Sequence, residues 1–201
     1  MAVWRLPGTL PTISSGPLGG GIGRRSWVIN ATVPMSYNRD DPDTHLTEIA
    51  GDIGLTGDGV GLLTGVDTGL LVEACDEGVT VWATVGLGNA GLAAAPAEPI
   101  AYRAGTINVV ARVPAAWTDA ALVNAVATVA EAKAQALRDL GYAATGTSTD
   151  ATCVIADADG PAEPYGGPRS RWGSRLARAV HEALLEGGRR FSAEQVAWSD
   201  R

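Results

Sequence analysis

Residues 106–156 decide the fold class of this chain, and they read TINVVARVPAAWTDAALVNAVATVAEAKAQALRDLGYAATGTSTDATCVIA. Alternating apolar residues predict a strand over residues 106–113, which stops at a proline. Thr118 then caps a helix that runs to residue 140 and stops at a glycine. A second strand, apolar throughout, is predicted over residues 151–156. A strand, a helix and a strand in this order indicate an α/β fold.

The segments on either side add shorter elements. Residues 1–25, rich in Gly, Pro and Ser, are predicted to form an irregular N-terminal segment, and residues 187–201 a C-terminal tail. No repeat or linker divides the chain, so we predict a single α/β domain over residues 1–201, with mixed β-sheets packed by helices. An αββα-type layered sandwich is one form of this arrangement. Apolar spacing and turn residues predict strands at about 27–33, 59–64, 70–75 and 79–85, and helices at about 42–53 and 171–186.

The composition excludes several classes of protein. Of 201 residues, 46% are hydrophobic, and 15 Lys and Arg stand against 22 Asp and Glu, for a formal net charge of −7. A surface of this sign repels polyanions, so nucleic acid is not an expected partner. No apolar run approaches the roughly 20 residues that span a bilayer, and prolines and glycines interrupt any signal peptide. We therefore expect a cytoplasmic protein with no membrane partner, and a homo-oligomer is compatible with the sequence.

Metal chemistry is not expected from the cysteines and histidines. The chain has two of each, at Cys75, Cys153, His45 and His181, and their spacing matches no zinc-ligand motif. The sequence therefore predicts no metal site.

Two predicted strands carry polar residues on one face. Because successive strand residues point to opposite sides, Thr106 and Asn108 share a face of one strand. By the same alternation, Thr80, Trp82 and Thr84 share a face of the other. If the two strands pair, one sheet face presents all these side chains together. That face is either part of a ligand site or an ordinary solvated sheet surface.

Two loops add candidate site residues. GLGNAG, residues 86–91, matches the glycine spacing of a dinucleotide-binding fingerprint, but no helix is predicted after it. Its glycines instead allow a turn that brings Asn89 close to a ligand. TGTSTD, residues 145–150, is rich in hydroxyls, ends in Asp150 and precedes a strand, as both catalytic rims and ordinary turns do.

Seven segments in a fixed order give the chain a family resemblance. They are SSGPLGGG (14–21), NATVP (30–34), VGLLTGVD (60–67), TVGLGNA (84–90), GTINVV (105–110), AEAKAQAL (130–137) and TGTSTD (145–150). In this order and spacing they resemble the adenosylcobinamide amidohydrolase family over about residues 12–186. The resemblance implies corrinoid salvage, in which the amide joining aminopropanol to the corrin ring of adenosylcobinamide is hydrolysed to give adenosylcobyric acid. It also implies a corrinoid substrate that carries its own cobalt, and no separate cofactor.

A weaker similarity concerns the mechanism. The segments around Asn89, Thr106 and Asp150 are similar to those of β-aminopeptidases and ornithine acetyltransferases, whose nucleophile begins a strand after a position of self-cleavage. This similarity implies that Thr106 is the nucleophile and that Asn89 donates to the oxyanion. Cleavage after Gly105 would free the Thr106 α-amine to act as a base. In an uncleaved chain, Asp150 would be the base, or Thr106 would only hydrogen-bond the substrate.

Further residues are expected to bind the substrate. Asn108 and Thr147 belong to the same strand face and the same loop as the catalytic candidates, so we expect them within reach of one ligand. Trp82 is expected either to form an apolar wall for the corrin ring or to belong to the core. The segments that match the family add Thr64 and Asp67 as substrate-binding residues.

The chain departs from the family pattern after Tyr165. Arg169 stands where the family has a histidine, and Ser174 stands where it has a glutamate. Arg169 is still expected to bind substrate. These departures motivate an alternative function, a non-catalytic corrinoid carrier or sensor that retains the pocket.

Overall fold

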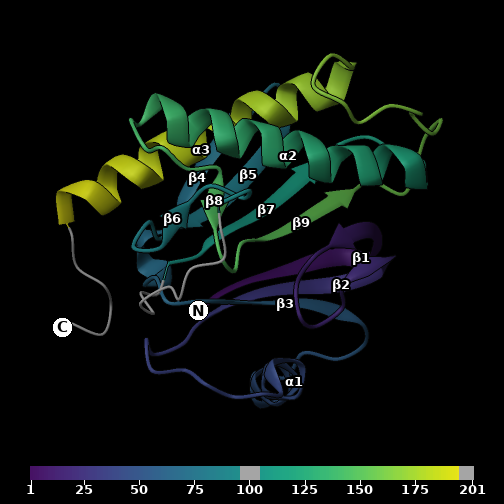
Figure 1. Ribbon diagram of the computed structural model, residues 1–201. Helices are drawn as coiled ribbons and strands as arrows, with labels where there is room; N and C mark the ends of the chain where they lie inside the picture. The colour runs from purple at the N-terminus through teal and green to yellow at the C-terminus, as the bar shows by residue number, and fades with distance from the viewer. Residues whose placement is uncertain (96–104, 195–201) are drawn as a thin grey trace.

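A single seven-stranded sheet organises the protein. The computed structural model describes residues 1–95 and 105–194 (Figure 1). The strands run in the order β3-β2-β1-β9-β7-β5-β4, and a separate two-stranded sheet pairs β6 with β8. The β2–β3 and β7–β9 pairs are parallel, whereas the other neighbours are antiparallel, so the sheet is mixed. The elements are β1 Ala2–Ser14, β2 Gly21–Thr32, α1 Pro42–Asp52, β3 Gly59–Thr64, η1 Thr68–Leu70, β4 Val72–Asp76, β5 Val79–Val85, β6 Ala90–Gly91, β7 Ile107–Val113, α2 Asp119–Asp139, β8 Gly146–Thr147, β9 Ala151–Ala156 and α3 Arg171–Glu194.

The sheet bends back on itself into two leaves, which we call the four-stranded leaf (β4, β5, β7, β9) and the three-stranded leaf (β1, β2, β3). Helices α2 and α3 cover the outer face of the four-stranded leaf, and α1 covers the outer face of the three-stranded leaf (Figure 1). A third apolar cluster lies between the leaves and draws buried residues from β1, β2, β3, β7 and β9. The predicted α/β fold is confirmed, and its layers form an αββα sandwich.

Strand β1 joins the two leaves. It pairs with β2 along most of its length, but with β9 only over Thr12, Ile13 and Ser14. A register shift between Arg5 and Leu10 interrupts its pairing with β2, and such bulges bend a strand. The bend lets one strand serve both leaves.

The prediction for residues 1–25 is wrong, because they form β1 and the first part of β2 rather than an irregular segment. Gly8 lies at the bulge and Gly21 at the end of the hairpin, with φ of +87° and +83°, the left-handed region that glycine favours. The glycines therefore permit a bulge and a turn within a long hairpin. Pairing with distant residues overrode the local composition.

The predicted end of the last helix at Gly187 is also wrong. Helix α3 continues to Glu194, so most of the predicted tail is helical, and residues 195–201 lie outside the described residues. A Cβ on Gly187 would lie 2.5 Å from Val85 Cγ2, and one on Gly188 would lie 2.3 Å from Leu140 Cδ1. These two glycines let the helix approach the sheet and α2 closely rather than ending it.

The elements of the central stretch match their predictions closely. Thr118 accepts a hydrogen bond from the Ala121 backbone N at the start of α2, and Gly141 follows its end with φ +85°. Strand β4 begins two residues later than predicted, because residues 68–70 form a 3-10 turn. Across the described ranges, no helix is both long and apolar enough to cross a membrane.

The pairing of the two polar-faced strands is confirmed, with Thr84 opposite Asn108 and Trp82 opposite Val110. The alternative of a solvated sheet surface is wrong. Thr84 is 0% exposed and Asn108 is 1% exposed, because this face of the four-stranded leaf packs against the three-stranded leaf. Thr84 and Asn108 therefore lie between the leaves.

Candidate active site

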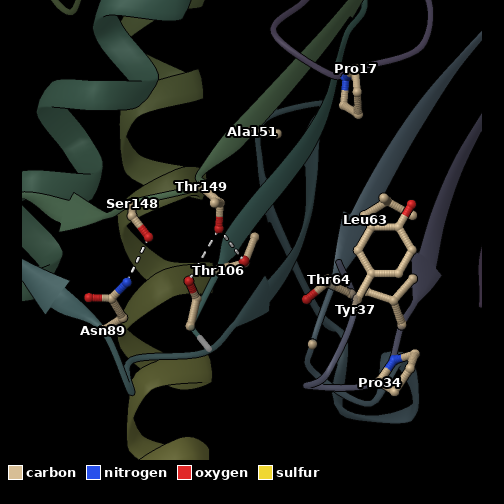
Figure 2. Close-up of a pocket in the computed structure, with 13 residues that line it drawn as sticks. Pro17, Pro34, Tyr37, Leu63, Thr64, Asn89, Thr106, Ser148, Thr149 and Ala151 are labelled. Atoms are coloured by element: carbon tan, nitrogen blue, oxygen red, sulfur yellow. Dashed lines mark hydrogen bonds between the residues drawn. The ribbon is translucent and has the colours of Figure 1, made fainter. Parts of the chain in front are cut away.

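A cleft of about 280 Å³ opens between the two leaves, near the start of β7 (Figure 2). One side, which we call the polar wall, carries Asn89, Thr106, Ser148 and Thr149 from the loops of the four-stranded leaf. The other side, which we call the apolar wall, comes from the three-stranded leaf and its loops and carries Pro17, Val33, Pro34, Tyr37 and Leu63. Thr64, Gly65, Gly105 and Ala151 complete the lining.

Thr106 lies on the polar wall directly before β7 and is 8% exposed. Its Oγ1 lies 2.7 Å from Thr149 Oγ1, and the Thr149 hydroxyl also lies 3.4 Å from the Gly105 carbonyl oxygen (Figure 2). The Thr106 carbonyl accepts a hydrogen bond from the Gly86 backbone N at 3.0 Å. Both the backbone and the side chain of Thr106 are thus held by hydrogen bonds, which fixes the position of its hydroxyl on the cleft wall.

Asn89 lies beside Thr106 on the turn that follows β5. Its Nδ2 donates to Ser148 Oγ at 2.6 Å, which ties the turn to the hydroxyl-rich loop (Figure 2). A Cβ on Gly105 would lie 2.7 Å from the Asn89 backbone N, so only glycine allows this close approach. The predicted turn therefore brings an amide to the same cleft as the Thr106 hydroxyl.

Asp150 lies behind the polar wall and connects three elements. Its carboxylate accepts hydrogen bonds from the Ile107 backbone N at 2.9 Å, from the Thr147 backbone N at 3.0 Å and from the Thr147 hydroxyl. It also pairs with Lys133 Nζ of α2 at 2.5 Å, and the two side chains are only 10% and 17% exposed. The contacts of Asp150 therefore go to β7, its own loop and α2, and none of them is to the Thr106 hydroxyl.

Asn108 lies beneath the cleft and crosses from one leaf to the other. Its Nδ2 donates to Asn30 Oδ1 at 2.9 Å and to the Leu63 carbonyl at 2.8 Å, and Asn30 in turn donates to Thr84 Oγ1 at 3.1 Å. Asn108 Oδ1 is buried and has no hydrogen-bond partner within the described part of the chain. This polar link joins the two leaves directly under the site.

The other predicted site residues are spread over the molecule. Thr64 lines the cleft, and Thr147 lines a neighbouring hollow together with Lys133. Asp67 accepts from the Gly69 backbone N at 2.8 Å and begins the 3-10 turn. The structure brings Thr64 to Thr106 and Asn89, and it does not place Asp67 in the cleft lining.

Two predicted substrate-binding residues lie away from the cleft. Trp82 packs on Trp4, with ring centroids 5.7 Å apart, and its Nε1 donates to Glu73 Oε2 at 2.6 Å. Arg169 is exposed and lines a hollow between α2 and α3, and Ser174 lies in the same hollow. Both departures from the family pattern thus lie on the helix layer and outside the cleft lining.

Sequence reasoning missed three residues that shape the site. Lys133 carried a signal, since it is the only lysine in a chain rich in arginine. Asn30 carried one too, because it shares a strand face with Val28, which is buried between the leaves. Tyr37 follows β2 in a loop, and no periodicity distinguished it.

A fixed threonine hydroxyl, a neighbouring amide donor and an apolar wall in one cleft of an α/β sandwich are groups that hydrolases use. The matches to known proteins agree with that class. The chain belongs to the adenosylcobinamide amidohydrolase family, whose family model matches residues 1–195.

Two relatives carry that name. The adenosylcobinamide amidohydrolase of Methanosarcina mazei is 31% identical over 191 residues, which cover 90% of this chain and 92% of the relative. That of Halobacterium salinarum is 36% identical over 177 residues, which cover 82% of this chain and 74% of the relative. The crystal structure of the PH0078 protein from Pyrococcus horikoshii matches with a TM-score of 0.46 at 15% identity, covering 89% of this chain and 72% of that one.

Proposed function

We propose that this protein hydrolyses the amide between aminopropanol and the corrin ring of adenosylcobinamide, giving adenosylcobyric acid and aminopropanol in the cytoplasm. The observation that carries the proposal is the Thr106 hydroxyl, which is held on the cleft wall beside the Asn89 amide. Membership of the adenosylcobinamide amidohydrolase family supplies the substrate class.

In the proposed reaction Thr106 is the nucleophile. Its Oγ1 attacks the amide carbon and gives its proton to a base, and the Asn89 Nδ2 donates to the oxyanion that forms. Such a donor contributes about 2.7–4 kcal/mol in a comparable hydrolase. The base returns the proton to the departing amine, which leaves as aminopropanol. Water then hydrolyses the Thr106 ester, releasing the corrinoid acid and restoring the hydroxyl.

The contacts of Asp150 argue against it as that base. Both carboxylate oxygens accept from other donors, and none of these donors is the Thr106 hydroxyl. We therefore assign Asp150 a positioning role and propose the Thr106 α-amine, freed by cleavage after Gly105, as the base. Intact-mass measurement tests this point: the expected result is two fragments, residues 1–105 and 106–201. A fully active, uncut chain contradicts the freed-amine base and leaves the reaction itself in place.

The cleft dimensions support recognition of an amide arm rather than of a whole corrinoid. Sites for drug-sized ligands have about 300–1,000 Å³, and a corrin is larger than such ligands. A cleft of about 280 Å³ therefore admits the arm that carries the aminopropanol amide, with the ring at the mouth. The hydroxyl and amide groups of the polar wall suit the arm, and the apolar wall suits the hydrocarbon next to it.

The deciding experiment incubates purified protein with adenosylcobinamide and measures released aminopropanol and adenosylcobyric acid. Adenosylcobyric acid is the matched control ligand, because it lacks the scissile amide. Multiple turnovers support the proposal. Tight binding without product would instead support the alternative, a corrinoid carrier or sensor, and neither binding nor turnover would point to a different amide substrate. The placement of Arg169 and Ser174 outside the cleft favours the enzyme, since the departures that motivated the carrier leave the cleft lining intact.

A further inference from the structure

On the apolar wall, Tyr37 is held both through its backbone and through its ring. It is half-buried, lines the cleft and lies between Leu63 and Pro34, across from Thr106 (Figure 2). Its backbone N donates to the Pro34 carbonyl at 2.9 Å, which closes the turn after β2. Tyr37 is the one aromatic residue among the described residues that line the cleft.

His45 holds the Tyr37 ring in place. The two rings stack, with centroids 5.5 Å apart and planes 19° apart, and His45 Nδ1 lies 3.1 Å from the Tyr37 hydroxyl. His45 belongs to α1, and the next residue, Leu46, anchors that helix in the apolar cluster against the three-stranded leaf. Burial is the largest effect on Tyr37 and raises the pKa of its phenol, so the hydroxyl stays protonated at neutral pH. The ring is therefore a preorganised surface rather than a mobile side chain.

The described residues that line the cleft carry no charged side chain. The polar wall offers hydroxyls and an amide to a neutral amide, whereas the apolar wall offers a ligand mainly burial of hydrocarbon. A rigid aromatic side chain buries a large area at small entropic cost. The Tyr37 ring can therefore bury more hydrocarbon of a ligand than the neighbouring prolines can. Tyr37 thus offers the largest rigid apolar surface on this wall.

We propose that Tyr37 is a specificity-determining residue that packs against the hydrocarbon edge of the corrinoid when its amide arm reaches Thr106, and that His45 is its positioning residue. This inference rests on the proposed function. It assigns the two walls different tasks: the Thr106 side performs the chemistry, and the Tyr37 side selects which ligand is held there.

The test measures kcat and KM separately for adenosylcobinamide with Tyr37→Ala, Tyr37→Leu and Tyr37→Phe. Loss of the ring should raise KM about tenfold or more in Tyr37→Ala with little change in kcat. The Phe variant keeps the ring and should stay within about threefold of the wild type, and the Leu variant should fall between them. If Tyr37→Ala does not fold, as judged by thermal unfolding, the comparison of Leu with Phe carries the test.

A double-mutant cycle tests the role of His45. His45→Ala should raise KM by about threefold in the wild type and have no further effect in Tyr37→Ala, because it acts through the tyrosine ring. An additive effect would show that His45 acts independently of Tyr37.

The two proposals fail in distinguishable ways. A wild type that turns over adenosylcobinamide while Tyr37→Ala has an unchanged KM overturns the specificity role and leaves the proposed function standing. A wild type that neither binds nor hydrolyses the corrinoid overturns both, and this is seen before any variant is made.

Discussion

The same strands run through both ends of the space between the two leaves, but one end is apolar and the other is polar. At the packing end, Trp82 of β5 lies against Trp4, within the apolar cluster between the leaves. At the cleft end, only two residues further along the same strand face, Thr84 joins Asn30 and Asn108 in a polar link. Strand parity correctly places Trp82 and Thr84 on one face. It does not reveal which end of that face opens to a ligand, because the opposing leaf decides this.

The largest expected effect is a loss of activity at the cleft end, on substitution of Thr106. Thr106→Ala should lower kcat/KM by about 10⁴-fold or more, since the nucleophile is lost, and should change the free energy of unfolding by less than about 1 kcal/mol. Thr106→Ser, the matched control, keeps a hydroxyl and should retain part of the activity. Steady-state kinetics and denaturant unfolding measure the two quantities. An active Thr106→Ala enzyme would remove Thr106 as the nucleophile.

Asn89→Ala should produce the next largest loss, about 10²–10³-fold in kcat, because the oxyanion loses a donor. Ser148→Ala is the control, since it removes the partner of Asn89 Nδ2 and leaves the amide itself. That variant should lose much less activity. A change confined to KM in Asn89→Ala would mean that the amide binds the ground state and the transition state equally.

At the packing end, a substitution should lower stability and leave activity unchanged. Trp82→Ala removes a half-buried ring and should lower the free energy of unfolding by about 2 kcal/mol, with kcat and KM within about twofold of the wild type. Trp82→Phe should recover part of the stability. The original expectation that Trp82 forms a wall for the corrin returns if corrinoid affinity falls with an unchanged unfolding curve.

The smallest effect is expected outside both ends, on the helix layer. Arg169→His restores the residue that the family pattern implies, yet it should change kcat/KM by less than about twofold, because Arg169 is exposed and lies in the hollow between α2 and α3. Arg169→Ala serves as the control for loss of the charge. A tenfold gain in Arg169→His would extend the functional site to that hollow.

Local signals predicted the central stretch well. The proline after β7, the Thr118 cap and the glycine after α2 each act within a few residues, so these boundaries could be read from the sequence. The hairpin of β1 and β2 depends on pairing with distant residues, and the continuation of α3 past Gly187 depends on contact with Val85. Neither of these is visible locally.

The candidate site follows the same division. Thr106 and Asn89 could be placed together because each lies next to an end of one of two strands that pair side by side. The Lys133 partner of Asp150 comes from a helix on the other face of the leaf, and Tyr37 comes from the opposite leaf. Contacts across layers are set by packing, and no spacing rule within one segment reports them.

The separation of the two walls has a consequence for engineering. The loop after β2, which carries Pro34 and Tyr37, belongs to a different leaf from Thr106 and Asn89, and the polar link of Asn30 and Asn108 holds the leaves in register beneath it. The two walls of the cleft can thus vary independently of each other. We expect that exchanging residues 34–38 changes which amide is accepted and leaves Thr106 and Asn89 in place, because Arg39 and Asp41, which pair at the start of α1, are kept.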